Sequence, residues 1–149
     1  MAYSEKILSL IFPSSLEDVE FLESKYPNRN LVENAIVTRF APSPTGFIHI
    51  GGVYIAVLGK DLTRNPESVF FIRIEDTDQK RKVEDSKTQF SKTFKYFGIE
   101  SDEDESNSIY GPYTQSKRAN IYLSYVKKLM QNNRAYPCFC TKEMLEEQT

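Results

Sequence analysis

The sequence predicts an α/β fold with a parallel sheet, on the basis of two observations. A strand-like run at residues 36–40 is followed by a helical stretch at 53–63 and by a second strand-like run at 69–75. Strand, helix and strand at this spacing form a right-handed crossover unit with two parallel strands. The second run also begins with four apolar residues in succession, which is typical of a strand covered on both faces.

Residues 1–34 are expected to form a helical extension before this unit. Apolar residues recur there at helical spacing in two groups, which predicts two short helices, and Pro27 and Asn28 end the second. The extension has no clustered ionisable residues and no glycine-rich loop. We therefore favour a packing or interface role for it over a catalytic role.

A further helix is expected after the second strand, at residues 83–97. It ends at Gly98, and its spacing places Phe90, Phe94 and Phe97 on one face, so we expect all three rings in the core. The acidic run that follows is interpreted as a solvated loop.

The carboxyl-terminal part is expected to contain the clearest helix of the chain, at residues 116–133. Apolar and aromatic side chains trace one stripe along it, namely Tyr122, Tyr125, Val126, Leu129 and Met130. Residues 135–140 are predicted to follow as a strand, and the last eight residues to begin another helix.

Length and composition fit a globular protein with one core. The 149 residues are 40% hydrophobic and include ten Phe and nine Tyr, unlike a disordered chain. The net charge of −2 gives no global field that would attract nucleic acid, so such contacts must come from local patches. No apolar run approaches the roughly 20 residues of a membrane helix, and no signal-peptide pattern follows Met1. We expect a cytoplasmic protein without membrane contact.

The segment from Arg39 to Gly52 has the features of a phosphate site. It reads Arg-Phe-Ala-Pro-Ser-Pro-Thr-Gly-Phe-Ile-His-Ile-Gly-Gly and contains the only histidine, His49, just before a predicted helix. Glycines at a helix start let backbone N–H groups approach an anion, and the helix dipole favours negative charge there. The imidazole is placed to donate a further hydrogen bond.

Charged side chains lie where the two predicted strands end. Ligands of parallel sheets bind beyond the carboxyl ends of the strands, which is where Arg39 and Glu75 both fall. The Arg39 guanidinium either faces a ligand carboxylate or forms a salt bridge to Glu75 or Asp76. The residues alone give these two interpretations equal weight.

Three motifs in order resemble the class I aminoacyl-tRNA synthetases, and among them the bacterial glutamyl-tRNA synthetases. They are Pro-Ser-Pro-Thr-Gly followed by His-Ile-Gly-Gly, then Arg-Ile-Glu-Asp-Thr-Asp at 73–78, then Gly-Pro-Tyr-Thr-Gln-Ser-Lys-Arg at 111–118. The resemblance implies the incomplete first half of a Rossmann-like catalytic domain. The implied divisions are 1–34 for the helical extension, 35–110 for the first half of the catalytic domain and 111–149 for the start of an insertion that binds the acceptor end of tRNA.

The activity implied by the resemblance is that of a glutamate–tRNA ligase. Such an enzyme uses ATP and Mg²⁺ to convert glutamate to glutamyl-adenylate, and then transfers the glutamyl group to the 3′ end of tRNA(Glu). The full-length enzyme is expected to be a cytoplasmic monomer.

The family's functional residues map onto several positions of this chain. By resemblance, Arg39 contacts the side-chain carboxylate of glutamate, and His49 contacts ATP phosphate as the catalytic residue. The other assigned positions are Ala41, Ser43 and Glu75 at the amino group of glutamate, and Gly51 and Gly52 at ATP.

Two further pairs of residues have weaker assignments. Lys117 and Arg118 are expected to contact tRNA phosphate, although a turn followed by a helix cap also explains them. Cys138 and Cys140 match half of a zinc site that some family members carry in the full-length protein. Two buried thiols are the equally weighted alternative for this pair.

The chain is interpreted as a fragment, because the second, lysine-rich signature of the class and the anticodon-binding domain are absent from it. We expect no measurable aminoacylation by the 149 residues alone. Two alternatives stay open: a paralogous synthetase that glutamylates a tRNA base, and a non-catalytic nucleotide-binding module. The intact run at 111–118 argues against the paralogue.

Overall fold

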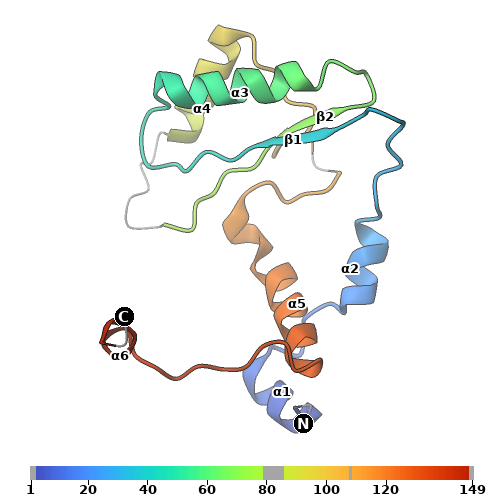
Figure 1. Cartoon of the computed structure of the whole chain (residues 1–149), viewed down its shortest axis with the longest axis vertical. Helices are drawn as coiled ribbons and strands as arrows, with labels where there is room; N and C mark the ends of the chain where they lie inside the picture. Colours follow the sequence, from blue (N-terminus) through green and yellow to red (C-terminus); the bar gives the residue numbers. More distant parts are fainter. Residues whose placement is uncertain (1–2, 79–85, 108, 148–149) are drawn as a thin grey trace. The chain divides into compact units, whose positions relative to one another are not determined.

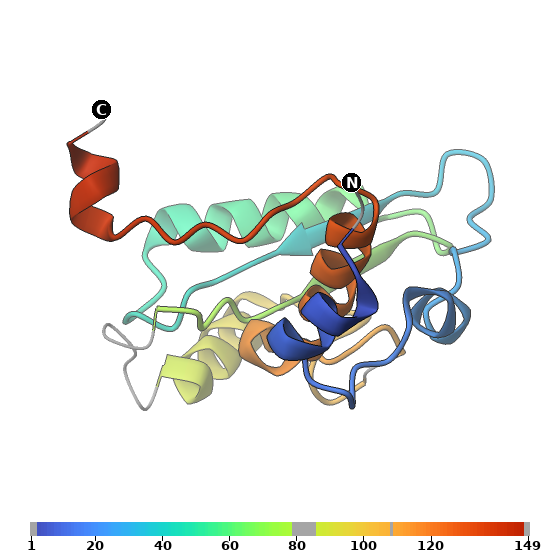
Figure 2. The same cartoon turned by 90° about the horizontal axis from the view of Figure 1, so that it is seen from below.

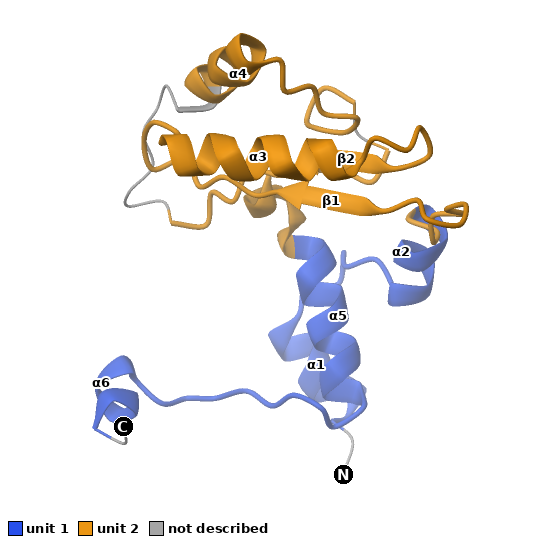
Figure 3. Ribbon diagram, turned by 45° about the horizontal axis from the view of Figure 1, so that its top comes forward, with its two compact units in different colours: residues 1–25, 120–149 blue, residues 26–119 orange. Residues whose placement is uncertain are grey.

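The computed structural model describes residues 3–78, 86–107 and 109–147 (Figure 1). Its elements in chain order are α1 (Glu5–Ile11), α2 (Val19–Lys25), β1 (Val37–Phe40), α3 (Ile50–Leu62), β2 (Val69–Ile72), α4 (Ser86–Phe97), the 3₁₀ helix η1 (Gln115–Arg118), α5 (Ala119–Gln131) and α6 (Lys142–Glu146). They fall into two compact units, residues 26–119 and residues 1–25 with 120–149 (Figure 3). These units differ in their limits from the three ranges expected above, which describe parts of a longer domain and stay a prediction.

The predicted parallel strand pair is confirmed. Strands β1 and β2 run parallel, with Val37 opposite Val69 and Phe40 opposite Ile72. Helix α3 connects them and runs alongside β1 in Figure 1 and Figure 2. The apolar run of β2 explains this arrangement, because the ring of Phe70 is fully buried.

Hydrogen bonds continue the pairing beyond the end of β2. The Arg73 N–H donates to the Phe40 carbonyl at 3.0 Å, and the Glu75 N–H donates to the Pro42 carbonyl at 2.9 Å. The chain after β1 therefore stays attached to the chain after β2. Side chains that follow the two strands are therefore held together at the carboxyl end of the sheet.

The side of β2 that faces away from β1 also forms backbone hydrogen bonds. The Ile72 N–H donates to the Glu103 carbonyl at 3.0 Å, and the Ile74 N–H donates to the Tyr113 carbonyl at 2.9 Å. Successive residues of an extended strand direct their backbone groups to alternate sides. β2 therefore pairs with β1 on one side and, through isolated bridges at Glu103 and Thr114, with two short segments on the other side.

The core of unit 26–119 lies between the sheet and the two helices α3 and α4. Its buried members are Phe40, Val53, Ala56, Phe70, Ile72, Ile74, Phe90, Phe94 and Ile99. The expected burial of Phe90 and Phe94 is confirmed, but that of Phe97 is wrong, because Phe97 is 47% exposed. Its ring packs edge-on against Tyr96 at 5.1 Å instead of entering the core.

Two helix boundaries differ from those expected. Helix α3 begins at Ile50, three positions earlier than predicted, because the N–H groups of Gly52 and Val53 both donate to the His49 carbonyl, at 2.9 and 3.2 Å. The helix expected at 116–133 is divided into η1 and α5. The Lys117 N–H donates to the Thr114 carbonyl at 3.1 Å, which is the tighter 3₁₀ pattern.

The strand predicted at residues 135–140 is wrong. No ladder hydrogen bond joins this segment to another part of the chain that the structure describes. An extended segment becomes a strand only when its N–H and carbonyl groups find a neighbouring backbone. Helix α6 follows, as expected for the last residues.

The second unit contains both ends of the chain. Leu8 and Phe12 are buried against Met130 of α5, and Lys128 of α5 pairs with Glu20 of α2 at 2.6 Å. The first 25 residues therefore have a packing role. None of the helices that the structure describes has the length and apolar character needed to cross a membrane.

We expect Phe70→Ala to destabilise the chain by about 3–5 kcal/mol, because it leaves a cavity at the centre of the sheet and helix layers. Urea unfolding followed by circular dichroism measures this change. The matched control is Phe47→Ala, since Phe47 is 82% exposed and should shift the free energy of unfolding by less than about 0.5 kcal/mol. Equal effects of the two substitutions would contradict this description of the core.

Candidate functional site

The site begins with an ion pair between the two strand ends. Nη1 of Arg39 lies 3.1 Å from Oε1 of Glu75, and Nη2 of Arg73 lies 3.3 Å from the same oxygen. The Arg39 and Glu75 side chains are 43% and 29% exposed. The salt bridge to Glu75, one of the two alternatives for Arg39, is therefore present, and solvent still reaches both groups.

Strand alternation explains why Arg39 points away from the core. The Thr38 hydroxyl donates to the Gly59 carbonyl of α3 at 2.8 Å, and the Phe40 ring is buried. Both neighbours therefore face the helices. Side chains alternate along a strand, so Arg39 occupies the opposite face of the sheet.

The loop after β1 is held beside Glu75. The bond from the Glu75 N–H to the Pro42 carbonyl places residues 41–43 next to this carboxylate. Pro44 is fully buried and anchors the loop, while Ser43 is exposed and its carbonyl accepts from the Thr45 N–H at 2.8 Å. The structure thus brings together Arg39, the loop with Ala41 and Ser43, and Glu75.

His49 is exposed at the start of α3 and is not part of the core. Its side chain makes no capping hydrogen bond, and its imidazole packs over Gly51. A Cβ atom at Gly51 would lie 3.0 Å from both Cε1 and Nδ1 of the ring, so a larger residue here would require the exposed ring to shift. The first N–H groups of a helix lack partners within it, and the Gly51 N–H is one of these, whereas that of Gly52 is bonded to the His49 carbonyl.

Sequence reasoning missed the role of Asp76 at this edge. Asp76 is 3% exposed, and its carboxylate accepts hydrogen bonds from the N–H of Ser116 at 2.9 Å and from the Ser116 hydroxyl at 2.8 Å. This pair connects the end of β2 to the start of η1. The only signal in the sequence was an acidic residue directly after Glu75, which by itself suggests a partner for Arg39.

The two predicted cations of η1 differ in accessibility. Nη1 of Arg118 donates to the carbonyls of Tyr110 and Pro112, at 3.3 and 3.1 Å, and so stabilises its own loop. Lys117 pairs with Glu105 at 3.2 Å, and its side chain remains 59% exposed. Of the two, Lys117 is the more accessible to a phosphate.

Cys138 and Cys140 lie in the other unit, and both thiols are free and exposed. The expectation of two buried thiols is wrong, because their segment pairs with no strand. Hydrogen bonds from the backbone N–H and the thiol of Cys140 lower the pKa of Cys138. The described residues contain no group of three His, Cys, Asp or Glu side chains that could hold a metal, so zinc would need ligands from outside them.

The arrangement in unit 26–119 offers two kinds of charge recognition. The guanidinium of Arg39 complements a carboxylate, and the carboxylate of Glu75 complements an ammonium group. The start of α3, with His49 above it, suits an anion. The carboxyl end of the sheet therefore has the charges to bind an acidic amino acid and a phosphate.

Comparison with known proteins gives a consistent result. The family described as "tRNA synthetases class I (E and Q), catalytic domain" matches residues 35–149. A glutamate–tRNA ligase of Clostridium perfringens (strain 13 / Type A) is 46% identical over 98% of this chain and 28% of its own length. One from Clostridium beijerinckii is 46% identical over 96% of this chain and 27% of its own length. The chain thus spans about a quarter of the length of these curated relatives.

A solved structure is similar as well. The crystal structure of a glutamate tRNA ligase from Elizabethkingia meningosepticum, in complex with its amino acid, superposes with a TM-score of 0.69 at 37% identity. The match covers 78% of this chain and 23% of that one. The expected Rossmann-like fold of an incomplete catalytic domain is confirmed by this similarity.

We expect Gly51→Ala to displace the imidazole of His49, because the added methyl group would lie within contact distance of the ring. His49 is the only histidine, so its ring signals in an ¹H–¹⁵N NMR spectrum need no assignment. These signals should shift in Gly51→Ala and stay in place in the control Tyr54→Ala, which alters an exposed residue of the same helix. Unchanged ring signals in Gly51→Ala would refute the contact.

Proposed function

Because the chain belongs to the catalytic-domain family of class I tRNA synthetases for glutamate and glutamine, we propose that it is part of a glutamate–tRNA ligase. The observation that carries this proposal is the Arg39–Glu75 pair beside the loop at 41–43. A guanidinium and a carboxylate at one strand edge match the opposite charges of glutamate. The proposed substrates are glutamate, ATP and tRNA(Glu).

Glutamate would replace the internal ion pair. The Arg39 guanidinium binds the side-chain carboxylate of glutamate, for which its planar pair of donors is suited. Glu75 then binds the ammonium group together with Ser43 and the backbone of Ala41. Both partners are already partly exposed, so only a modest loss of solvation accompanies the exchange.

ATP would bind at the start of α3. His49 and the N–H of Gly51 donate to its phosphates, and Gly52 keeps the first turn free of side chains. Mg²⁺ bound with ATP supplies further neutralisation of phosphate charge. The described residues contain no cluster of acidic ligands dedicated to such an ion, so we assign it no protein ligand.

The proposed reaction has two steps. An oxygen of the α-carboxylate of glutamate forms a bond to the α-phosphorus of ATP, and the bond from that phosphorus to pyrophosphate breaks. A terminal ribose hydroxyl of tRNA then takes the glutamyl group and releases AMP. The chain's residues act by positioning and by charge neutralisation, which are the main sources of rate in such transfers.

Several features of the complete protein are part of this proposal. We place the complete protein in the cytoplasm as a monomer. We also place Lys117 near the tRNA backbone. Zinc at Cys138 and Cys140 would require two more ligands from the remainder of the protein.

Pyrophosphate exchange by the complete protein, with glutamate, ATP and tRNA, tests the proposal. Exchange together with glutamate attached to the terminal adenosine of tRNA supports the ligase. Glutamate attached to an internal base, located by nuclease digestion of the product, would instead support the paralogue that modifies a tRNA base. Absence of exchange while a control enzyme is active would leave a nucleotide-binding module.

We expect Arg39→Gln to raise the KM for glutamate by about 10- to 100-fold, because it removes a charge-assisted hydrogen bond to the substrate. The KM for ATP should change little. Steady-state charging assays measure both values. The matched control is Arg64→Gln, since Arg64 lies just after α3 and its exposed side chain pairs with the exposed Asp61 near the end of that helix. A KM for glutamate that stays the same in Arg39→Gln would contradict the assigned role.

A further inference from the structure

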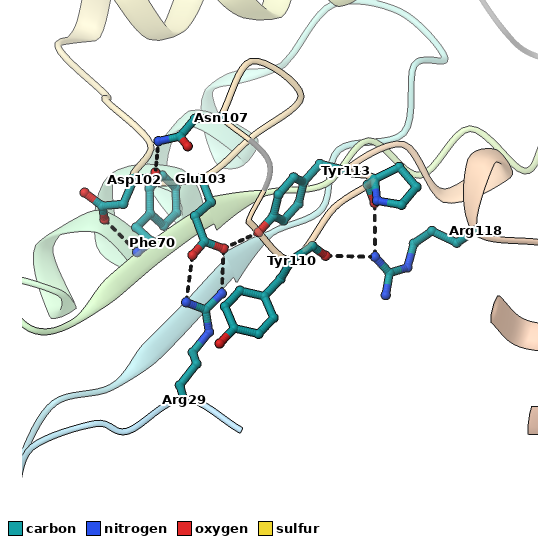
Figure 4. A network of polar contacts seen from close by, with 9 residues as sticks. Arg29, Phe70, Asp102, Glu103, Asn107, Tyr110, Tyr113 and Arg118 are labelled. Carbon is teal, nitrogen blue, oxygen red and sulfur yellow. Dashed lines mark hydrogen bonds and ion pairs between the residues drawn. The ribbon is translucent and has the colours of Figure 1, made fainter. Parts of the chain in front are cut away.

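A buried polar network lies on the side of β2 opposite the proposed glutamate site (Figure 4). Its centre is Glu103, which is only 4% exposed, so the interpretation of the acidic run as a solvated loop is wrong at this residue. Arg29 donates to both oxygens of this carboxylate, from Nη1 at 2.7 Å and from Nη2 at 2.5 Å. The ring of Tyr110 stacks on the guanidinium at 3.9 Å from its Cζ. Two hydrogen bonds and the stacked ring therefore fix the orientation of the Arg29 guanidinium against the Glu103 carboxylate.

Tyr113 completes the network. Its hydroxyl donates to the Glu103 carboxylate, and its side chain is 3% exposed. Burial alone would raise the pKa of Glu103, but the hydrogen bonds from Arg29 and Tyr113 outweigh burial and lower it. Burial and the bond to Glu103 raise the pKa of Tyr113, so its hydroxyl remains a donor. The carboxylate is therefore charged and depends on Arg29 for compensation.

The backbones of Glu103 and Tyr113 pair with β2 through isolated bridges on the side that faces away from β1. The carbonyls of Glu103 and Tyr113 accept from the N–H groups of Ile72 and Ile74, at 3.0 and 2.9 Å. The Gln115 N–H, in the first residue of η1, donates back to the Ile74 carbonyl at 2.8 Å. The Arg29 network thus joins the side chains of Glu103 and Tyr113, whose carbonyls bond to β2 just before η1.

Arg29 precedes the part of the chain that matches the family, which begins at residue 35. It nevertheless belongs to the same compact unit, residues 26–119, as the site. Without Arg29, a buried carboxylate would lose its charge partner, which is strongly unfavourable. The carboxylate could relieve this by taking up a proton or by admitting water, and we expect either change to loosen Glu103, and with it Tyr113, from β2.

We propose that Arg29 is a positioning residue that holds the segment leading into η1 against β2, and so places Lys117 for the acceptor end of tRNA. The first half of this proposal, that Arg29 holds the segment against β2, concerns the chain alone. The second half, that this places Lys117 for tRNA, rests on the proposed function. Two experiments on the complete protein test the two halves separately.

Amide hydrogen exchange with residue resolution tests the first half. In Arg29→Gln, the amides of Ile72 and Ile74 should exchange at least about tenfold faster, because they bond to the loosened segment. The amides of Arg73 and Glu75 bond to the opposite side and should change by less than about twofold. Arg29→Lys should lie in between, since lysine keeps the charge but not the paired donors. A uniform increase at all four amides, or none, would overturn the proposal.

Steady-state charging tests the second half. Arg29→Gln should raise the KM for tRNA by about tenfold and leave the KM values for glutamate and ATP within about twofold of wild type. Arg64→Gln is again the matched control and should change none of them. An unchanged KM for tRNA, in a variant whose Ile72 and Ile74 amides exchange faster, would overturn the tRNA role. If the wild-type protein does not charge tRNA, the proposed function fails, and hydrogen exchange still decides the role of Arg29.

Discussion

The parallel pairing of β1 with β2, continued beyond both strand ends, is the constraint on which the candidate site depends. The bond from the Glu75 N–H to the Pro42 carbonyl joins the two exits and fixes the loop that follows β1. Arg39 can meet Glu75 only because this register holds. The start of α3 is delivered by the same loop, so one set of backbone bonds positions both the ion pair and His49.

Two buried carboxylates, Asp76 and Glu103, show the same principle. Asp76 fixes the start of η1 through the amide and hydroxyl of Ser116, and Glu103 is held by Arg29 and Tyr113. Each carboxylate is buried and hydrogen-bonded, which makes its partner difficult to replace. The Arg39–Glu75 pair is more open, which suits the proposed function, in which a ligand displaces this internal partner.

Sequence patterns predicted those helices and strands that form because of residues close together in the sequence. The apolar run of β2 and the order of strand, helix and strand indicated the crossover unit, and the Arg39–Glu75 contact was one of two stated alternatives. The pattern at 135–140 was misleading, because a strand also needs a neighbouring backbone, which no local sequence reveals. Asp76 and Arg29 were missed for a related reason: their partners lie 40 and 74 residues away along the chain.

A structure of the complete protein with bound glutamate tests the central claim most directly. We expect the Arg39 guanidinium to leave Glu75 and to bind the side-chain carboxylate of glutamate, while Glu75 binds the ammonium group. The backbone bonds between the two strand exits should be unchanged. Glutamate bound elsewhere, with the Arg39–Glu75 ion pair intact, would contradict the account.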